Sequence, residues 1–252
     1  MFIKIKALHG YKLQSQDGEI GRVNEFYFDD RYWTIRYLVA DTGTWLTGRQ
    51  VLISPYALKE VVPNEHHLDV ALTKKRIENS PALDTHKPVS QQFESEYYDY
   101  YSYPYYWSGS YVWGNYPSIE RDRSKWGGVA KPSDNWDRHL RSTKEVTGYH
   151  VQALDGEIGH ITDFVVDDAT WTIRYLIVGT KNWWPGKQVL ISPLWIERVS
   201  WAESKVVINL SREAIQESPE FTSEALISRD FETNLYDHYN RKGYWIDELA
   251  NA

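Results

Sequence analysis

Two pairs of adjacent aspartates are the residues whose type and spacing could hold a metal ion. Asp29 and Asp30 form the first pair, and Asp167 and Asp168 form the second. Clustered carboxylates suit hard cations such as calcium and magnesium. However, two carboxylates supply too few ligands alone, and aspartate is a favoured residue in turns. We therefore predict a turn at each pair and no metal site.

Histidines and serines form no recognisable catalytic or zinc-binding pattern. The sequence has eight histidines and no cysteine, so thiolate chemistry and cysteine-based zinc sites are excluded. No Gly-x-Ser-x-Gly motif and no phosphate-binding glycine loop is present. A Ser-His-Asp arrangement is recognised by geometry and stays open at this point. We predict no catalytic residues, no cofactor-binding residues and no cofactor.

A run of aromatic residues between positions 97 and 116 is the most unusual local feature. It is either an exposed surface for a protein partner or a carbohydrate, or an internal clasp packed across two domains. Nearby charges are acidic, which disfavours stacking on nucleic-acid bases. The candidate interaction surface consists of Tyr100, Tyr101, Tyr103, Tyr105, Tyr106, Trp107, Tyr111 and Trp113.

A second aromatic group is predicted to lie in loops. It consists of Trp45, Trp183, Trp184 and Trp195. These side chains could line a binding pocket. Equally, they could anchor an interface between two domains, where aromatic residues are enriched.

Most of the sequence consists of two copies of one repeat. Residues 10–107 align with residues 148–245 at a constant offset of 138 and without a gap. A repeat of this length is the size of a small domain. We therefore predict domains at residues 1–107 and 140–252, packed as an internal pseudo-dimer. Residues 108–139 would be a linker, held in part by Trp113, Trp126 and Trp136.

Each repeat is predicted to form a small, mainly β barrel followed by short helices. Residues 23–28 and 33–40 have the composition of two strands, and residues 29–32 form a polar loop between them. Shorter strands separated by turns follow, as in small barrels and sandwiches. Thr73 and Ser211 are predicted to cap a first helix, and Ser90 and Ser228 a second.

A four-residue loop would also fix the register of this hairpin. It would place Glu25 opposite Arg36, and in the second repeat Asp163 opposite Arg174. Opposite charges facing each other across two strands contribute about 0.2–1 kcal/mol. We therefore predict a structural ion pair at each of these two places.

Composition limits the classes of partner. The formal net charge is -7 and the sequence pI is about 5.6, which argues against a nucleic-acid surface. No run approaches the roughly 18 apolar residues of a membrane span, and residues 1–6 lack the pattern of a signal peptide. We predict a cytoplasmic protein without membrane insertion. Peripheral membrane association and further homo-oligomerisation stay open.

The order of motifs resembles the PRC-barrel family. In both repeats a Gly-Tyr opening is followed by Asp-Gly-Glu-Ile-Gly, then Trp-Thr-Ile-Arg-Tyr-Leu, then Val-Leu-Ile-Ser-Pro. The resemblance covers about residues 5–83 and 143–221. The family is named for the cytoplasmic domain of the photosynthetic reaction-centre H subunit and includes a domain of a ribosome maturation factor. The resemblance implies two tandem β-barrels, used in a bacterial protein as assembly modules without a shared catalytic constellation.

We therefore expect a non-catalytic interaction or scaffold module that binds an unidentified protein partner. Three alternatives stay open. The chain could be an accessory protein of a reaction-centre-like or other membrane electron-transport complex, or an adaptor in ribosome maturation. It could also be a small-ligand binder or an enzyme that uses an interdomain cleft.

Overall fold

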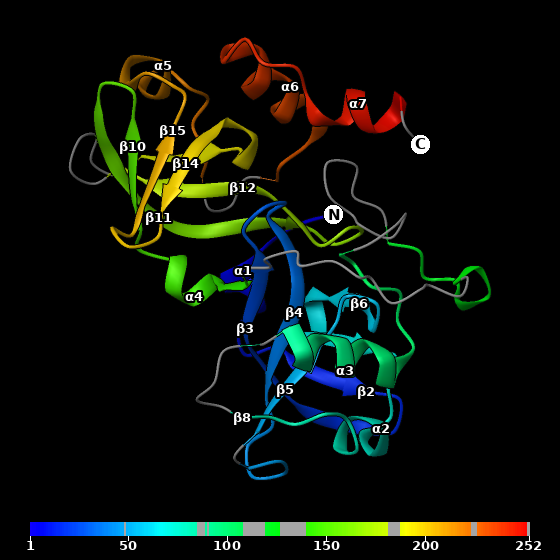
Figure 1. Cartoon of the computed structure of the whole chain (residues 1–252). Coiled ribbons are helices and arrows are strands. Elements are labelled where there is room, and N and C mark those ends of the chain that lie inside the picture. Colours follow the sequence, from blue (N-terminus) through cyan, green and yellow to red (C-terminus); the bar gives the residue numbers. More distant parts are fainter. Residues whose placement is uncertain are drawn as a thin grey trace. The chain divides into compact units, whose positions relative to one another are not determined.

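The computed structural model describes residues 1–47, 49–84, 89, 91–107, 119–126, 140–180, 187–222 and 226–250 (Figure 1). The chain forms two compact units. Unit 1 comprises Met1–Lys6, Lys144–Asp167 and Ile173–Ala252, and unit 2 comprises Ala7–Thr143 and Asp168–Thr172. The second repeat thus supplies most of unit 1, and the first repeat supplies most of unit 2.

Unit 2 is built on strands in the order β4-β3-β2-β7-β6. Pairing is antiparallel except between β2 and β7. Strand β5 pairs with β4, β8 with β5, and β9 with β3. The strands are β2 (Lys12–Ser15), β3 (Gly18–Asp29), β4 (Thr34–Asp41), β5 (Arg49–Ile53), β6 (Leu58–Val62), β7 (His67–Val70), β8 (Leu83–Asp84) and β9 (Leu140–Ser142). The helical segments of this part of the chain are α1 (Ile5–Leu8), η1 (Pro63–Glu65), α2 (Lys74–Glu78), α3 (Gln91–Tyr101) and η3 (Arg123–Lys125).

Unit 1 repeats this plan in the order β14-β15-β10-β11-β12. Strand β13 pairs with β12, and β1 pairs with β11. The strands are β1 (Phe2–Lys4), β10 (His150–Ala153), β11 (Gly156–Asp167), β12 (Thr172–Gly179), β13 (Gln188–Ile191), β14 (Ile196–Ser200) and β15 (Lys205–Ile208). The helical segments are α4 (Thr143–Val146), η4 (Pro193–Trp195), α5 (Arg212–Gln216), α6 (Arg229–His238) and α7 (Tyr244–Ala250). Helices α6 and α7 follow one another at the end of the chain (Figure 1). The predicted mainly β fold is confirmed.

The units differ from the predicted domains because the repeats exchange segments. Strand β1 precedes the first repeat, but it pairs with β11 of the second repeat from Phe2 opposite Asp167. Strand β9 precedes the second repeat, but it pairs with β3 of the first. The tip of the β11–β12 hairpin also belongs to unit 2, where Trp171 stacks on Phe26 with ring centroids 5.9 Å apart. Each unit therefore contains residues from both repeats.

One glycine in each unit sits where a side chain has no room. Gly21 in β3 has φ +137°, and a Cβ atom there would collide with the backbone carbonyl of Asp41. Gly159 in β11 has φ +149° and faces the carbonyl of Gly179 in the same way. Both lie beside a β-bulge at which the pairing with the preceding strand shifts. Only glycine allows the close backbone approach at these bends.

The predicted register of the first hairpin is wrong. Strand β3 continues to Asp29, and β4 begins at Thr34, so the turn is 30–33, with Trp33 at φ 53°. Two bulges in β3 shift the pairing further, and Glu25 lies opposite Val39 instead of Arg36. The register predicted from the loop length holds only if the pairing of the two strands is uninterrupted. Each bulge inserts an extra residue into β3 and shifts the pairing.

Helix caps are confirmed wherever the structure describes them. The hydroxyl of Thr73 accepts the Arg76 N–H at the start of α2, and Ser211 accepts the Ala214 N–H at the start of α5. Ser228 caps α6 by accepting the N–H of Phe231. The predicted cap at Ser90 lies outside the described residues. Helices therefore follow the strands in both units, as expected.

Candidate functional site

A buried ion pair occupies the centre of unit 2. The guanidinium of Arg36 is fully buried and donates from Nε to Asp29 Oδ2 at 2.6 Å. Its central carbon lies 4.1 Å from the ring centroid of Tyr106, a cation–π distance. The second carboxylate oxygen of Asp29 accepts the Tyr32 N–H at 2.7 Å and closes the turn. Asp29 thus serves the turn and the arginine together.

A buried glutamate joins helix α3 to this ion pair. Glu94 accepts the hydroxyl of Tyr37 from β4 at 3.0 Å and the hydroxyl of Tyr106 at 2.6 Å. Burial and the Glu94 carboxylate together raise the pKa of Tyr37 well above its ordinary value, so the phenol remains a donor. The resulting network of aspartate, arginine, tyrosine and glutamate ties the strand, the helix and the segment after the helix together.

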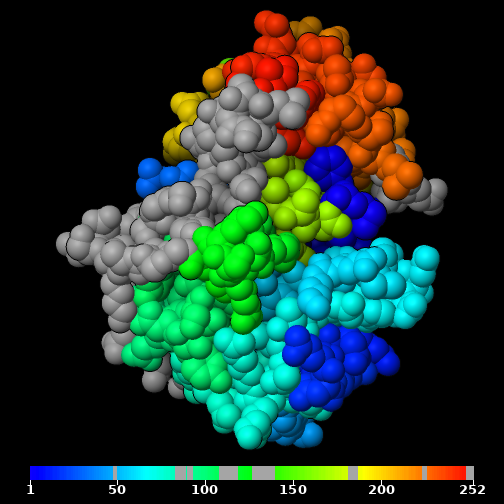
Figure 2. Space-filling model, turned by 90° about the vertical axis from the view of Figure 1, so that its right-hand side faces the viewer, coloured from blue at the N-terminus to red at the C-terminus, as the bar shows by residue number. Residues whose placement is uncertain are grey.

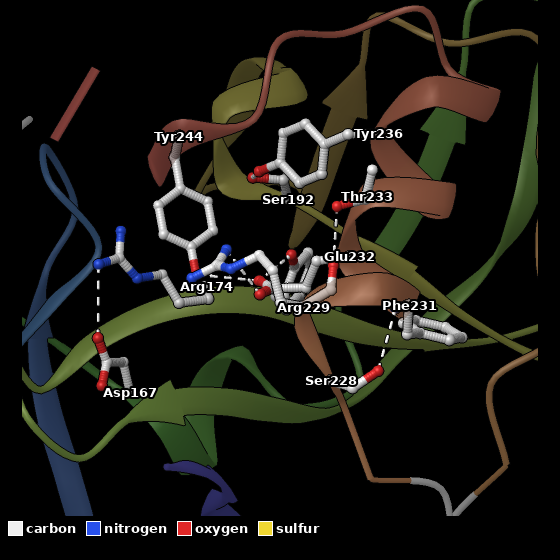
Figure 3. Close-up of polar contacts among 11 residues, drawn as sticks. Asp167, Arg174, Ser192, Ser228, Arg229, Phe231, Glu232, Thr233, Tyr236 and Tyr244 are labelled. Carbon is white, nitrogen blue, oxygen red and sulfur yellow. Dashed lines mark hydrogen bonds and ion pairs between the residues drawn. The ribbon is translucent and has the colours of Figure 1, made fainter. Parts of the chain in front are cut away.

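Unit 1 contains the same network at positions 138 residues later (Figure 3). Glu232 on α6 accepts the hydroxyl of Tyr175 at 2.6 Å and that of Tyr244 at 2.9 Å. The guanidinium carbon of Arg174 lies 4.0 Å from the ring centroid of Tyr244. Its Nη2 atom donates to Asp167 at 3.5 Å. The polar residues that hold the helix to the strands are therefore duplicated with the fold.

One cation distinguishes the network of unit 1. Arg229 forms an ion pair with Glu232 at 2.8 Å, and its guanidinium carbon lies 4.3 Å from the ring centroid of Trp245. The first repeat has Gln91 at this position. Burial raises the pKa of Glu232, while the hydrogen bonds from Tyr175 and Tyr244 and the charge of Arg229 oppose that rise. Because Arg229 is half exposed, this network extends to the surface.

The predicted ion pairs are therefore corrected. The acidic partner of Arg36 is Asp29, and that of Arg174 is Asp167. Glu25 instead accepts the hydroxyl of Ser142 on β9. Asp163 accepts the backbone N–H groups of Lys6 at 3.1 Å and Phe164 at 2.8 Å. Both predicted acids thus bond to other groups, and in unit 1 the Asp163 bond to Lys6 fastens the exchanged N-terminal segment.

Most of the described part of the aromatic run is buried and does not form an exposed surface. The exposed-surface interpretation is wrong for five of its side chains, all of which are buried: Tyr101, Tyr103, Tyr105, Tyr106 and Trp107. Tyr100 is half-buried and donates its hydroxyl to the carbonyl of Arg76 at 2.8 Å. Tyr111 and Trp113 lie outside the described residues. Within unit 2 the run packs on itself, with the rings of Tyr101 and Tyr103 stacked at 5.2 Å.

The loop tryptophans contact residues of their own units. Trp195 is buried in unit 1, where its ring centroid lies 5.1 Å from that of Tyr236 on α6. Trp45 is half-buried in unit 2, and the ammonium of Lys74 lies 5.3 Å from its ring centroid. Trp183 and Trp184 lie outside the described residues.

Across the part of the chain that the structure describes, no cluster of three or more histidine, cysteine or acidic residues could hold a metal ion. Arginines bind both acids of the first predicted turn. Asp29 pairs with Arg36, and Asp30 pairs with Arg141 at 3.2 Å.

A segment that sequence analysis treated as linker covers part of unit 2. Arg121 donates to the carbonyls of Pro55 at 3.0 Å and Leu58 at 2.6 Å. The ring of Trp126 lies edge-on to Tyr56, with centroids 5.5 Å apart. Figure 2 shows residues 119–126, in bright green, lying against the cyan and blue-green residues of the same unit. Trp126 holds this segment as expected, whereas Trp113 and Trp136 lie outside the described residues. Because the segment has no counterpart in the other repeat, the repeat could not predict which surface it covers.

The corresponding surface of unit 1 carries exposed apolar side chains. Leu194 stands at the position of Tyr56 and is 66% exposed, and Leu154 stands at the position of Gln16 and is 60% exposed. Backbone hydrogen bonds link Leu154 to Leu210, and Asn209 to Trp195, which places the two leucines at the same end of the sheet. Every exposed large apolar residue in the described ranges belongs to unit 1: Met1, Leu154, Leu194, Leu226 and Ile246.

A comparison with known families matches the second repeat, from the end of β9 to α5, with the family model of the PRC-barrel domain. Residues 142–215 are a PRC-barrel domain. PRC-barrel domains are protein-interaction modules in general. A comparison with curated proteins gives no match. The network around Glu232 includes residues from α6 and α7, so it lies partly beyond the matched PRC-barrel domain.

No helix within the described ranges has the length and apolar character needed to cross a membrane.

Proposed function

We propose that this chain is a non-catalytic protein-interaction module whose partner docks on unit 1 around Leu154 and Leu194. One observation carries the proposal. The chain covers the equivalent surface of unit 2 with its own residues 119–126, whereas Leu154 and Leu194 on the surface of unit 1 are exposed. Exposed apolar side chains that lie together are typical of surfaces that bind other proteins.

The contacts in unit 2 indicate the chemistry of such a partner. There, Arg121 binds two backbone carbonyls, and Trp126 packs on the ring of Tyr56. In unit 1 the carbonyls at the equivalent positions are those of Pro193 and Ile196, and an exposed leucine replaces the tyrosine. The expected partner is an extended protein segment with an arginine and a large apolar side chain. Its arginine would bind the carbonyls, and its apolar side chain would cover Leu194.

Buried networks support a structural rather than a catalytic use of the polar residues. Glu232 and Arg174 both contact Tyr244, and together with Asp167 they fasten α6 and the start of α7 to the strands. A closed polar network makes a scaffold rigid, because each buried group keeps its partner only in one arrangement. A rigid surface binds a partner with a smaller loss of conformational entropy.

Site-specific crosslinking tests the proposal. A photoreactive amino acid replaces Leu194 in the full chain, and the crosslinked protein is identified from a lysate of the native host. We expect one dominant partner whose crosslinked segment contains an arginine and a large apolar residue. Leu154→Glu should abolish that crosslink, because it places a charge on the apolar surface.

Leu226→Glu is the matched control, since Leu226 is also an exposed leucine of unit 1. It should leave the crosslink intact. A crosslink that survives Leu154→Glu, or that Leu226→Glu removes equally, would overturn the proposed docking surface.

A further inference from the structure

Unit 2 contains a pocket that none of the contacts described so far explains. Its volume is about 330 Å³, the size of a small organic ligand. It is lined by Gln16, Ala71, Leu72, Thr73, Arg76 and Arg123. Two apolar side chains thus lie beside an amide, a hydroxyl and two guanidinium groups.

Both arginines keep donors free for a ligand. Arg76 donates one hydrogen bond to the carbonyl of Tyr101 at 3.2 Å, and its guanidinium carbon lies 5.4 Å from the ring of the same residue. Arg123 is positioned over the ring of Trp126 at 5.4 Å. Neither arginine has a carboxylate partner among the residues that the structure describes. Because a guanidinium carries five donors, each has N–H groups to offer an oxyanion.

The charges on α2 and η3 are mainly positive. Lys74, Lys75 and Arg76 lie on α2 with Glu78, and Arg123 and Lys125 lie on η3, which Asp122 precedes. The carboxylate of Asp122 accepts both the N–H and the hydroxyl of Ser124, so it caps its own short helix.

A buried hydroxyl near the arginines also lacks a partner. Tyr103 is 5% exposed, and its hydroxyl has no hydrogen-bond partner among the described residues. Burial raises the pKa of Tyr103, and the positive charges of Arg123 and Arg76 oppose that rise. The ring of Tyr103 stacks on Tyr101, over which Arg76 lies, and it is edge-on to Trp126, over which Arg123 lies. An unpartnered buried hydroxyl costs stability, and a bound ligand could supply its partner.

The second repeat lacks three of these polar groups. At the matching positions it has Leu154 for Gln16, Ala214 for Arg76 and Arg241 for Tyr103. Arg241 itself donates to the carbonyl of Asn209, the residue that corresponds to Ala71. The fold therefore forms without these polar groups, and their presence in unit 2 needs another explanation.

We propose that this pocket binds a small organic molecule that carries one oxyanion, either a phosphate or a carboxylate. Arg76 and Arg123 bind the oxyanion, and the apolar body of the ligand lies on Ala71 and Leu72. This site is independent of the proposed partner surface, because it lies in the other unit.

The proposal is tested by titrating the full chain with phenyl phosphate and with benzoate. Calorimetry measures the binding of each probe. Each probe joins one oxyanion to an apolar ring, and the pair distinguishes a phosphate ligand from a carboxylate ligand. We expect saturable one-site binding of at least one probe. Arg123→Gln and Arg76→Ala should each weaken that binding about tenfold or more, because each removes a charge-assisted contact.

Lys59→Ala is the matched control, since it removes one positive charge from an exposed position of the same unit. It should bind the probe as the wild type does. Arg76→Ala introduces the alanine that the second repeat has naturally, and Arg123 is exposed, so circular dichroism should show that both variants fold. Failure of both probes to bind, or equal binding by wild type and Arg123→Gln, would overturn the site.

Discussion

Arg36 and Arg174 occupy equivalent positions, but their ion pairs differ in burial and length. Arg36 lies 2.6 Å from Asp29, and the side chains are 0% and 5% exposed. Arg174 lies 3.5 Å from Asp167, whose side chain is 19% exposed. Removing one partner of a buried pair leaves an uncompensated charge, and that cost falls as water reaches the remaining group.

Arg36→Met should therefore destabilise the protein by about 3–5 kcal/mol, because it leaves Asp29 buried without its cation. Arg174→Met should cost less, about 1–3 kcal/mol, since water partly compensates Asp167. Urea unfolding of both variants measures the difference. The double variant Asp29→Asn, Arg36→Met should recover part of the loss. Equal costs at the two positions would contradict this account.

Glu232 makes stability depend on pH in a defined direction. Its pKa in the folded protein is raised above 4.5 because burial disfavours the carboxylate. As the pH rises from about 4.5 through the folded value, the unfolded chain loses this proton before the folded one does, so stability falls. Glu232→Gln removes this effect. The wild type should therefore lose stability relative to Glu232→Gln over that pH range.

Unfolding free energies at several pH values test this expectation. Glu220→Gln is the control, since Glu220 is an exposed carboxylate of the same unit. Parallel pH profiles of the wild type and Glu232→Gln would show that burial of Glu232 carries no pH-dependent cost.

Arg36 and Arg174 are recognisable in the sequence as paired residues, but their acidic partners are Asp29 and Asp167 and not the predicted Glu25 and Asp163. Arginine followed by tyrosine within a repeated strand marks the network, but nothing local marks Asp29 as the partner. The choice depended on the register, which two bulges in β3 displace. The glutamates were missed altogether, although Glu94 and Glu232 recur at the same offset as the tyrosines. A glutamate that recurs at the same position of an aromatic helix in both repeats is the sequence signal that could have identified them.

At the scale of elements, glycine bends decide how the long strands turn. Gly21→Ala places a methyl group against the carbonyl of Asp41 at a φ that only glycine adopts easily. The strands would have to separate there, and we expect a loss on the order of 3 kcal/mol. Gly43→Ala is the control, since Gly43 also has a positive φ but nothing within 4 Å of the added carbon. It should cost about 1 kcal/mol. Thermal unfolding ranks the two variants, and equal losses would contradict the steric argument.

Strands and helices were predictable where local chemistry determines them. Thr73 and Ser211 cap helices at the expected residues because a hydroxyl satisfies an N–H group that would otherwise lack a partner. Burial of the aromatic run was not predictable in the same way. Tyrosine suits an exposed surface and a core alike, so composition left both open. The contacts of Glu94 and Tyr106 with distant strand residues place these side chains in the core.

At the scale of the whole molecule, the repeat predicted two similar units but not their membership. An alignment of the two repeats shows what they share, whereas β1 and β9 lie before the aligned residues. Each of these strands pairs with the opposite repeat because of the path that the chain follows. The motifs shared by the two repeats carry no information about this pairing.

The exchanged strand gives a test at this scale. Deleting residues 2–6 should expose the β11 edge to solvent and speed its amide hydrogen exchange. The effect should appear in residues 156–167, far along the sequence, and not in β3. Mass spectrometry of peptides from both strands measures it. Faster exchange in β3 than in β11 would show that β1 supports the first repeat instead.

The exchange of β1 also constrains how the protein is made. The strand partner of Phe2–Lys4 lies far along the chain, at residues 165–167. Because a ribosome makes β11 long after β1, β1 cannot form this pairing until those residues have been synthesised. The closure of unit 1 therefore joins two segments that are made at widely separated times.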